Sequence, residues 1–490
     1  MSKKNSVQEK HRQQRKERLA AEKAIQKQKN IRKGSIIAIS SAVAVALVIT
    51  AIVIGVAKYR ETNAYKTGVV PITCGDNSVD LAMLAYYYYD GVYGLLDLYG
   101  EELEKNGIRP DPSKSLNDQY NGESSWHDYF IDSALGQITQ NLILAQAAKD
   151  EGIAITESEE SALSAKADRM DLSRYGKGVT KNDVLKCLRL DYIAIKYEYT
   201  KRSADTMSED ELTEYYDKYY KHFSTVDFRC LEVPYSDAYD MDSAEKYANA
   251  VVKNPTDDGF TQGIRDNVLF INPELTAENV EQIVSSSYVT KQSYSEGDIM
   301  SEWLFDAARK PYDVKVYHNE ATKSFTAYML TKVAEKDMLD TVNLRHILFR
   351  PETYGSEDAA LEKAKQVLEL WKNDGTTEEA FKNYAISYSE DAATCYLGGL
   401  YENVTSEELL SYLSAFKEWG FSSDRVKGDF EIVRSDFGFH IIYYVDKGLP
   451  SALGRTQKTV SSENFGELFT SLQTKYKVNT DESKLSKFNP

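Results

Sequence analysis

Two apolar segments in the C-terminal half of the chain each contain one histidine. Residues 342–349 read Val-Asn-Leu-Arg-His-Ile-Leu-Phe, and residues 437–445 read Phe-Gly-Phe-His-Ile-Ile-Tyr-Tyr-Val. Both are typical of β-strands. A lone strand histidine is more often a hydrogen-bonded core residue than a functional one, because an imidazole buried without a partner is costly. His346 and His440, however, lie in the first and last strands of one small unit. Such strands can pair, so the sequence predicts that the two rings meet.

The N-terminal part of the chain predicts a membrane anchor. Residues 35–57 contain no charged side chain and would span about 35 Å as a helix, enough for a bilayer core. Residues 1–34 carry twelve Lys or Arg against three acidic residues, a net charge of +9. The positive-inside rule therefore puts this tail in the cytoplasm, against anionic lipid, and the rest of the chain outside. A cleaved signal peptide ending at residues 55–57 is the alternative, but the long apolar run favours an anchor.

Charge and composition exclude several kinds of function. The whole chain has a net charge of −17, so the part after residue 34 carries −26, which argues against nucleic acid as a partner. The four cysteines are widely spaced and form no CxxC pair, and the six histidines are scattered. The sequence therefore predicts no metal site and no cofactor, and it leaves any disulfide pairing open.

Residues 75–223 have the pattern of an all-helical domain. Apolar residues recur at helical spacing, and Thr156–Glu159 and Ser208–Glu211 have the form of capping boxes. The tyrosine clusters at 86–89 and 215–220 are expected to be packing residues, although some could line a groove for a polypeptide. A further apolar stripe within residues 451–490 predicts a C-terminal helix that packs back on this domain.

Residues 224–337 and 340–448 look like an internal repeat with the element order β-α-…-α-β-β, so the fold class is α+β. Phe228-Arg-Cys-Leu aligns with Leu344-Arg-His-Ile, and the segment beginning at Tyr328 aligns with the one beginning at His440. In this alignment the first copy has Cys230 and Tyr328 in place of the two histidines. We interpret the first copy as a degenerate, structural one.

Residues 340–448 resemble the parvulin-type (PpiC-like) peptidyl-prolyl isomerases. The motifs that carry the resemblance are Arg345–Leu348, Tyr384–Asp391, Gly398–Gly399, Lys427–Asp429 and Phe437–Ile442. The exported part as a whole is similar to the extracytoplasmic foldases of the SurA and PrsA type, which combine a helical chaperone domain with one or two parvulin domains. The resemblance implies that His346, Asp391 and His440 form the catalytic centre, with Asp391 facing the prolyl amide of the substrate.

The proline pocket departs from the family pattern. The family's methionine position falls near Glu408 or Leu409, and its phenylalanine position near Tyr412 or Leu413. The resemblance implies that the substrate contacts Leu409, Tyr412, Leu413, Phe416 and Phe439. A pocket floored partly by Glu408 would hold a pyrrolidine ring poorly.

Two functions follow from these observations. The first is a membrane-anchored isomerase that assists folding of secreted proteins and acts on unfolded or nascent polypeptides containing X–Pro bonds. The second is a non-catalytic holdase for unfolded exported chains. The motif at His346, Asp391 and His440 favours the first, and the altered pocket with the degenerate first copy favours the second. A membrane-tethered scaffold without a client is a weaker third possibility.

Overall fold

The structure is a computed structural model of the chain. It describes residues 46–122, 124–237, 239–336, 338–410 and 414–490, together with residues 16, 20, 23 and 26–29. The chain divides into two compact units, which we describe separately. Unit 1 comprises Met1–Thr139, Asp171–Cys187 and Val478–Pro490, and unit 2 comprises Gln140–Met170 and Leu188–Lys477.

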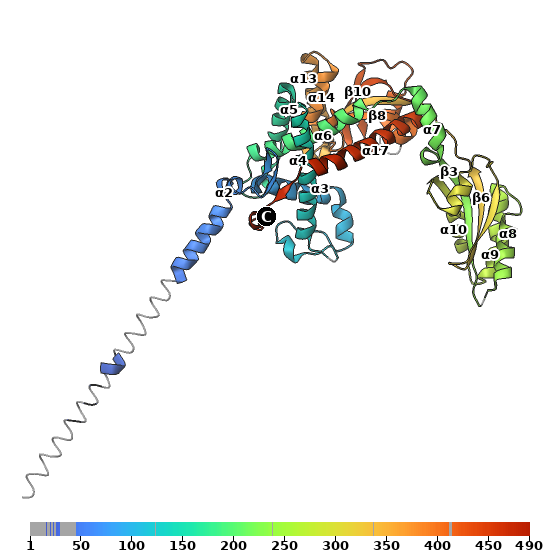
Figure 1. Cartoon of the computed structure of the whole chain (residues 1–490), viewed down its shortest axis with the longest axis horizontal. Coiled ribbons are helices and arrows are strands. Elements are labelled where there is room, and N and C mark those ends of the chain that lie inside the picture. Colours follow the sequence, from blue (N-terminus) through green and yellow to red (C-terminus); the bar gives the residue numbers. More distant parts are fainter. Residues whose placement is uncertain are drawn as a thin grey trace, which may run out of the picture. The chain divides into compact units, whose positions relative to one another are not determined.

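Unit 1 is built mainly from helices and is completed by the C-terminal residues. Its helices include α2 (Asn63–Gly68), α3 (Leu81–Lys105) and the first part of α4 (Trp126–Asp150) (Figure 1). A three-stranded antiparallel sheet has the order β11-β1-β2, with β1 at Ile72–Cys74, β2 at Asn77–Val79 and β11 at Asn479–Thr480. An aromatic core around Tyr88, Trp126 and Phe130 includes Phe488 from the C-terminal tail. The two ends of the described chain therefore share one fold.

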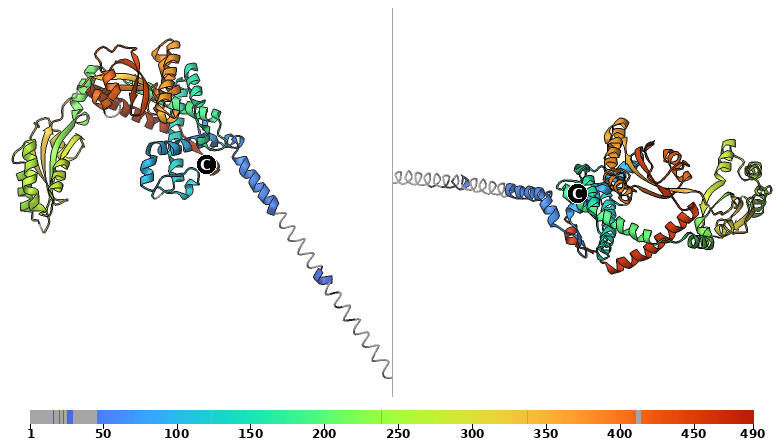
Figure 2. Two further views of the ribbon diagram at one scale, coloured as in Figure 1. Left: turned by 180° about the vertical axis from the view of Figure 1, so that it is seen from behind. Right: turned by 90° about the horizontal axis from the view of Figure 1, so that it is seen from above.

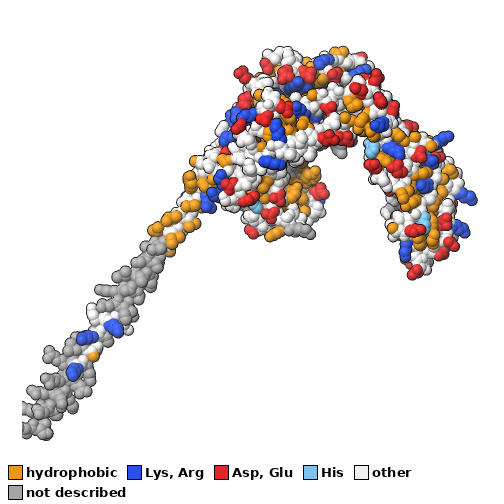
Figure 3. Space-filling model, viewed as in Figure 1, with side chains coloured by type: hydrophobic (Ala, Val, Ile, Leu, Met, Phe, Trp, Pro, Cys, Tyr) orange, Lys and Arg blue, Asp and Glu red, His pale blue; other side chains and the backbone are white. Residues whose placement is uncertain are grey.

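A helix at residues 46–60 precedes α2, and its apolar side chains, from Leu47 to Val56, are exposed (Figure 3). The predicted span at residues 35–57 lies only partly among the described residues, because positions 35–45 fall outside them. Among the residues that the structure describes, no helix is both long and apolar enough to cross a bilayer.

The helices of unit 2 begin where the sequence places their caps. The capping boxes at Thr156 and Ser208 are both formed, at the starts of α5 (Glu157–Ala167) and α7 (Glu209–Phe223). The long helix α17 (Ser451–Lys475) packs along α7, and hydrogen bonds from Gln457 and Asn464 to Asp205 tie it to the segment before α7 (Figure 2). The other helices of this group are the second part of α4 and most of α6 (Lys181–Ala204).

The first sheet of unit 2 has the strand order β4-β3-β6-β5, all antiparallel. Its strands are β3 (Thr225–Pro234), β4 (Tyr288–Ser293), β5 (Val314–Asn319) and β6 (Ser324–Lys332). Helices α8 (Met241–Val251), α9 (Asp257–Ile271) and α10 (Ala277–Ser286) bury an apolar core on one face of the sheet. The short helix α11 (Ile299–Leu304) and Phe305 pack on the other face.

The second sheet has the order β8-β7-β10-β9, and all its neighbouring strands are also antiparallel. Its strands are β7 (Thr341–Phe349), β8 (Leu400–Thr405), β9 (Phe430–Ser435) and β10 (Gly438–Lys447). Helices α13 (Glu357–Asn373) and α14 (Glu378–Tyr388) cover one face. The shorter α15 (Ser406–Leu410) and α16 (Ser414–Gly420) lie over the other. Helix α12 (Pro351–Tyr354) follows β7.

Strand register corrects one part of the sequence alignment between the two copies. Cys230 lies directly opposite Tyr328, whereas His346 lies opposite Ile442 and His440 opposite Leu348. When Cys230 is aligned with His346, the residue at the position of His440 is therefore Thr326, two residues before Tyr328. The first sheet still lacks an imidazole at both positions.

Trp371 of α13 holds the helical layer against the second sheet. It is 1% exposed, it contacts the rings of Phe381, Phe430 and Tyr443, and its indole N–H donates to the carbonyl of Thr377 at 2.9 Å. We expect Trp371→Ala to lower the local stability of β7 and β10 by about 3–5 kcal/mol, because it leaves a large cavity. Native-state hydrogen exchange of the strand amides measures this loss. Leu370→Ala, on the exposed side of the same helix, should change it by less than about 0.5 kcal/mol.

Candidate active site

The two histidines lie side by side on one face of the second sheet. β7 and β10 are adjacent and antiparallel, and the register places His346 and His440 on a diagonal of the same face. Each is 1% exposed. Their ring centroids are 5.3 Å apart with an interplanar angle of 22°, and the two Nδ1 atoms are 3.0 Å apart. The prediction that the rings meet is confirmed.

The imidazole pair belongs to a chain of hydrogen bonds. Nε2 of His346 is 2.8 Å from Oδ2 of Asp391 and 3.0 Å from the hydroxyl of Thr394. At the other end, Nε2 of His440 is 2.7 Å from the hydroxyl of Ser435. Thr394 also donates its hydroxyl proton to the Asp391 carboxylate. The chain thus runs from Ser435 through both rings to Asp391.

Matching donors with acceptors gives the tautomer of each neutral ring. The ionised carboxylate of Asp391 can only accept, so Nε2 of His346 carries a proton and its Nδ1 accepts. Nδ1 of His440 must then donate to it, which leaves Nε2 of His440 to accept from the Ser435 hydroxyl. The backbone N–H of Phe437 donates to that hydroxyl oxygen at 3.1 Å, which orients it. If both rings were protonated, two N–H groups would oppose each other across 3.0 Å.

A loop between α14 and β8 carries Asp391 to the rings, and its double glycine allows the close approach. The backbone N–H of His346 donates to the carbonyl of Gly399 at 2.8 Å. Gly398 and Gly399 have φ angles of +68° and +71°, in the left-handed region. A Cβ on Gly399 would lie 2.0 Å from the carbonyl oxygen of His346, so no larger residue fits there without moving the strand.

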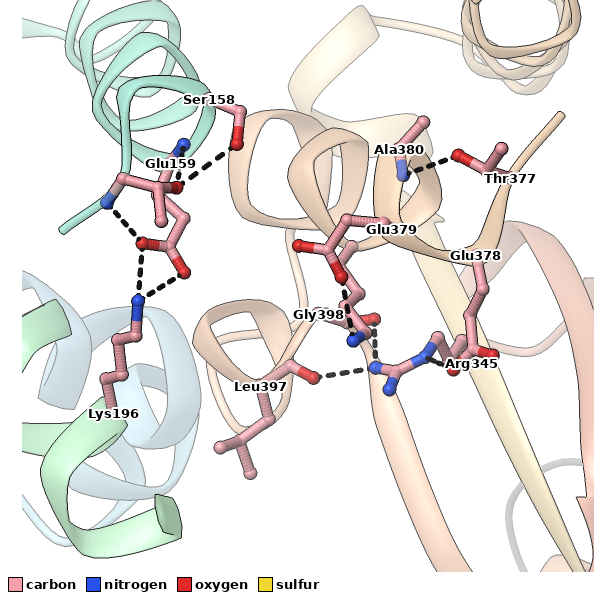
Figure 4. A network of polar contacts seen from close by, with 12 residues as sticks. Ser158, Glu159, Lys196, Arg345, Thr377, Glu378, Glu379, Ala380, Leu397 and Gly398 are labelled. Atoms are coloured by element: carbon pink, nitrogen blue, oxygen red, sulfur yellow. Dashed lines mark hydrogen bonds and ion pairs between the residues drawn. The ribbon is translucent and has the colours of Figure 1, made fainter. Parts of the chain in front are cut away.

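Arg345 anchors the same loop from the opposite side of β7. Its guanidinium is buried, and Nε contacts the Glu378 carboxylate at 3.0 Å. The same guanidinium donates to the carbonyls of Leu397 and Gly398 at 2.9 and 3.1 Å (Figure 4). The neighbouring residues Arg345 and His346 therefore have different roles, because successive residues of a strand face opposite sides. Arg345 holds the loop, and His346 enters the hydrogen-bond chain.

Burial and hydrogen bonding move the pKa values of the site in defined directions. Burial of the Asp391 carboxyl acts to raise its pKa, but the hydrogen bond and charge of His346, with the Thr394 hydroxyl, outweigh this effect and lower the pKa to about 2. Burial, reinforced by His346, lowers the pKa of His440 to about 3. Burial and the nearby Asp391 raise the pKa of Tyr401 to about 12. At neutral pH the site therefore holds an ionised Asp391, a neutral His440 and a protonated Tyr401.

The hydrogen-bond chain forms the wall of a cavity of about 310 Å³, a volume at the small end for ligand sites. Asp391, His346 and His440 line one part of it, and Arg350 and Tyr401 provide further polar groups. The rest of the lining consists of Glu408 and the apolar residues Leu348, Val404, Leu409 and Phe437.

The structure brings some of the predicted substrate-binding residues to this cavity. Leu409 lines it, and Phe416 packs edge-on against both histidine rings, at 5.6 and 4.8 Å between centroids. Tyr412 and Leu413 lie outside the described residues. The prediction that Phe439 contacts the substrate is wrong.

Phe439 lies on the opposite face of β10 from His440. It packs there in the core beneath α13 and α14. Successive residues of a strand point to opposite faces, so Phe439 cannot share a face with its neighbour. Phe437, which is 41% exposed, lines the cavity in its place.

Several site residues were not identified from the sequence. Thr394 and Ser435 are bonded to the imidazoles through a loop and a turn, and only the fold shows these contacts. The even spacing of residues 344, 346 and 348 along one strand could have indicated that Leu348 shares the face of His346. Among the described residues, no group of three or more His, Cys, Asp or Glu side chains is arranged to hold a metal ion, and none of the four cysteines forms a disulfide.

Comparisons with known proteins agree with the resemblance of this region to parvulins. Residues 328–448 match the family described as PPIC-type PPIASE domain. No curated protein matches the chain. Two of the solved structures that match the chain share little sequence identity with it.

The first is the crystal structure of peptidylprolyl isomerase (PrsA) from Bacillus anthracis, with 16% identity, 48% of this chain and 97% of that one covered, and a TM-score of 0.21. The second is the foldase protein (PrsA) from Lactococcus lactis, with 13% identity, 67% and 97% covered, and a TM-score of 0.19.

We expect the buried neutral His440 to make the site less stable in acid. Its pKa is about 3 in the folded state against an ordinary value of 6.5, so the unfolded chain binds the proton first. Stability should fall as pH drops from about 6.5 towards 3, with a slope of up to about 1.4 kcal/mol per pH unit. Asp391, with its pKa lowered from 3.8 to about 2, adds a further loss only below pH 3.8.

His440→Gln should therefore flatten the slope between pH 6.5 and 4. Urea unfolding followed by the methyl NMR signal of Ile441 at each pH measures this slope. His222→Gln is the matched control, because His222 is exposed and far from the pair in sequence. An unchanged slope in His440→Gln would show that the ring does not exclude a proton.

Proposed function

Because residues 328–448 form a parvulin-type peptidyl-prolyl isomerase domain, we propose that this chain is a membrane-anchored, extracytoplasmic isomerase that assists the folding of secreted proteins. The observation that carries the isomerase assignment is the hydrogen-bonded pair His346 and His440, joined to Asp391 at the wall of a partly apolar cavity. The uncharged run at residues 35–57 and the basic tail before it support the anchor and its orientation.

The reaction is rotation about an X–Pro bond, and it needs no nucleophile. Amide resonance gives this rotation a barrier of about 18–20 kcal/mol. Uncatalysed exchange therefore takes tens of seconds or more. In the planar amide the oxygen is partly negative and the nitrogen partly positive, and both charges fade as the bond twists. A site that disfavours this charge separation accelerates the reaction, because it favours the twisted state over the planar one.

Asp391 and the apolar lining both act in that direction. A fixed negative charge beside the carbonyl oxygen opposes the negative charge which resonance puts there. The low polarity of the lining near Leu348, Val404 and Leu409 also weakens the separated form relative to water. The histidine pair keeps the Asp391 carboxylate ionised and in place through the 2.8 Å contact with His346. His346 and His440 thus act as positioning residues for Asp391.

Asp391→Ala should reduce kcat/KM for a proline-containing tetrapeptide by about 10²-fold, because the preorganised charge at the amide is lost. A coupled cis–trans assay at pH 7 measures this change. Asp391→Asn keeps the size but removes the charge, so it should lose nearly as much activity.

Asp424→Ala, on an exposed segment of the same domain, is the control and should retain full activity. Wild-type protein without activity above background would rule out the isomerase assignment. Full activity in Asp391→Asn would instead show that the charge of Asp391 has no part in the reaction.

A holding activity towards unfolded chains is favoured by a second observation. The apolar stripe predicted on the C-terminal helix is only partly covered, because Phe465, Leu468 and Phe469 of α17 remain half-buried. The Phe465 and Phe469 rings stack at 6.4 Å between centroids. α17 packs along α7, whose Tyr215 and Tyr219 are also half-buried. Aromatic side chains with this exposure give broad, adaptable contact with an extended polypeptide.

Phe465→Ser with Phe469→Ser should raise the protein concentration needed to suppress aggregation of an unfolded client by roughly tenfold, because the half-buried aromatic pair is removed. Light scattering of the client measures suppression. The same variant should keep its tetrapeptide isomerase activity, and Asp391→Ala should keep its holding activity. Loss of both activities in one of these variants would mean that the two functions share one site.

A further inference from the structure

Unit 1 contains a cavity of about 610 Å³ that has no part in the isomerase site. Its walls come from residues 57–61 at the end of the N-terminal helix, Tyr65 and Lys66 of α2, and the start of α3. The loop at 176–177 and the C-terminal residues 486–490 complete them. Ala57, at its edge, is the last residue of the uncharged run at 35–57. The cavity therefore adjoins the end of the predicted anchor in the chain.

Lys66 is the unusual residue of this cavity. Its side chain is only 9% exposed, although lysines are rarely buried without a partner. Among the residues that the structure describes, no hydrogen bond or ion pair to its ammonium group is found within 4.0 Å. Burial lowers its pKa, and the charge of Glu61 only partly opposes this effect. Glu61 itself is paired with Lys177, at 3.2 Å.

The rest of the lining combines cationic residues with neutral polar and apolar ones. Arg60, Lys177 and Lys487 add three positive charges to that of Lys66, and Glu61 is the one acidic side chain among the described lining residues. This excess is notable in a chain with a net charge of −17. Leu81 and Phe488 contribute apolar surface beside these charges. A ligand that fits both parts has an anionic group, and several cationic side chains in the lining of one cavity favour phosphate over a single carboxylate.

We propose that this cavity binds a phosphate-bearing anion, with Lys66 as its buried counter-ion. Two sources share this chemistry: the headgroup of an anionic phospholipid, brought close by the anchor, and a free phosphate or phosphate ester. The bound anion would neutralise the charge of the Lys66 ammonium. It would also link the C-terminal residues 486–490 to the end of the helix at residues 46–60.

The test uses the full chain in a non-ionic detergent and two probes. Inorganic phosphate and dihexanoyl phosphatidylglycerol are titrated separately by isothermal calorimetry. Wild type should bind at least one probe saturably, and Lys66→Met should weaken that binding by roughly tenfold or more. Lys66→Arg, which keeps the charge, should retain it. Lys105→Met, an exposed lysine of α3, should bind like wild type.

Each outcome is informative. Tighter binding of the phospholipid than of phosphate assigns the site to a headgroup, and equal or tighter binding of phosphate assigns it to a soluble ligand. Lys66→Met should also melt no lower than wild type without ligand, because it removes an uncompensated buried charge. Absence of binding of both probes to wild type, or unchanged binding in Lys66→Met, would overturn the proposal. Isomerase activity should be unaffected in every variant, which separates this site from the proposed function.

Discussion

The arrangement of the isomerase site depends on one contact, between the Nδ1 atoms of His346 and His440 at 3.0 Å. Only one proton can lie between two nitrogen atoms at this separation, so the donor role of one ring fixes the acceptor role of the other. The fixed carboxylate at one end and the Ser435 hydroxyl at the other then determine the remaining two positions. The imidazole pair thus connects the Asp391 carboxylate to the Ser435 hydroxyl across two neighbouring strands.

This contact between the two rings requires three features of the surrounding fold. The rings must share a face of adjacent strands, the Asp391 loop must approach β7 closely, and water must be excluded. The first is provided by the pairing of β7 with β10, the second by the glycine at position 399, and the third by the packing of Phe416. The first sheet of unit 2 has the same strand order without either histidine. The architecture is therefore stable without the pair, and the pair is an addition to the scaffold and not a requirement for it.

The parts of this site that sequence could predict are those set by local chemistry. Apolar strands with one histidine each, the double glycine and the capping boxes at Thr156 and Ser208 all follow from rules about neighbouring residues, and the structure contains them. Strand alternation was also available and would have excluded Phe439 from the face of His440. The contacts of Thr394 and Ser435 with the imidazole rings could not be predicted from the sequence, because a loop and a turn bring these two residues to the rings. The alignment of Tyr328 with His440 failed for a related reason, since register is set by pairing between strands and not along one of them.

The proline pocket differs from the family pattern at Glu408, which lies near the family's methionine position. Its carboxylate accepts hydrogen bonds from the backbone N–H and the hydroxyl of Thr405, at 2.7 and 3.0 Å, at the start of α15. It is thus engaged as a helix cap, and its charge is already stabilised by donors when substrate arrives. The next residue, Leu409, is 4% exposed and supplies apolar wall to the cavity. Glu408 itself lines the cavity, as expected from the sequence, so a pyrrolidine ring would meet Leu409, Val404 and Leu348 beside this capped carboxylate. The substitution therefore changes the pocket without removing its apolar surface.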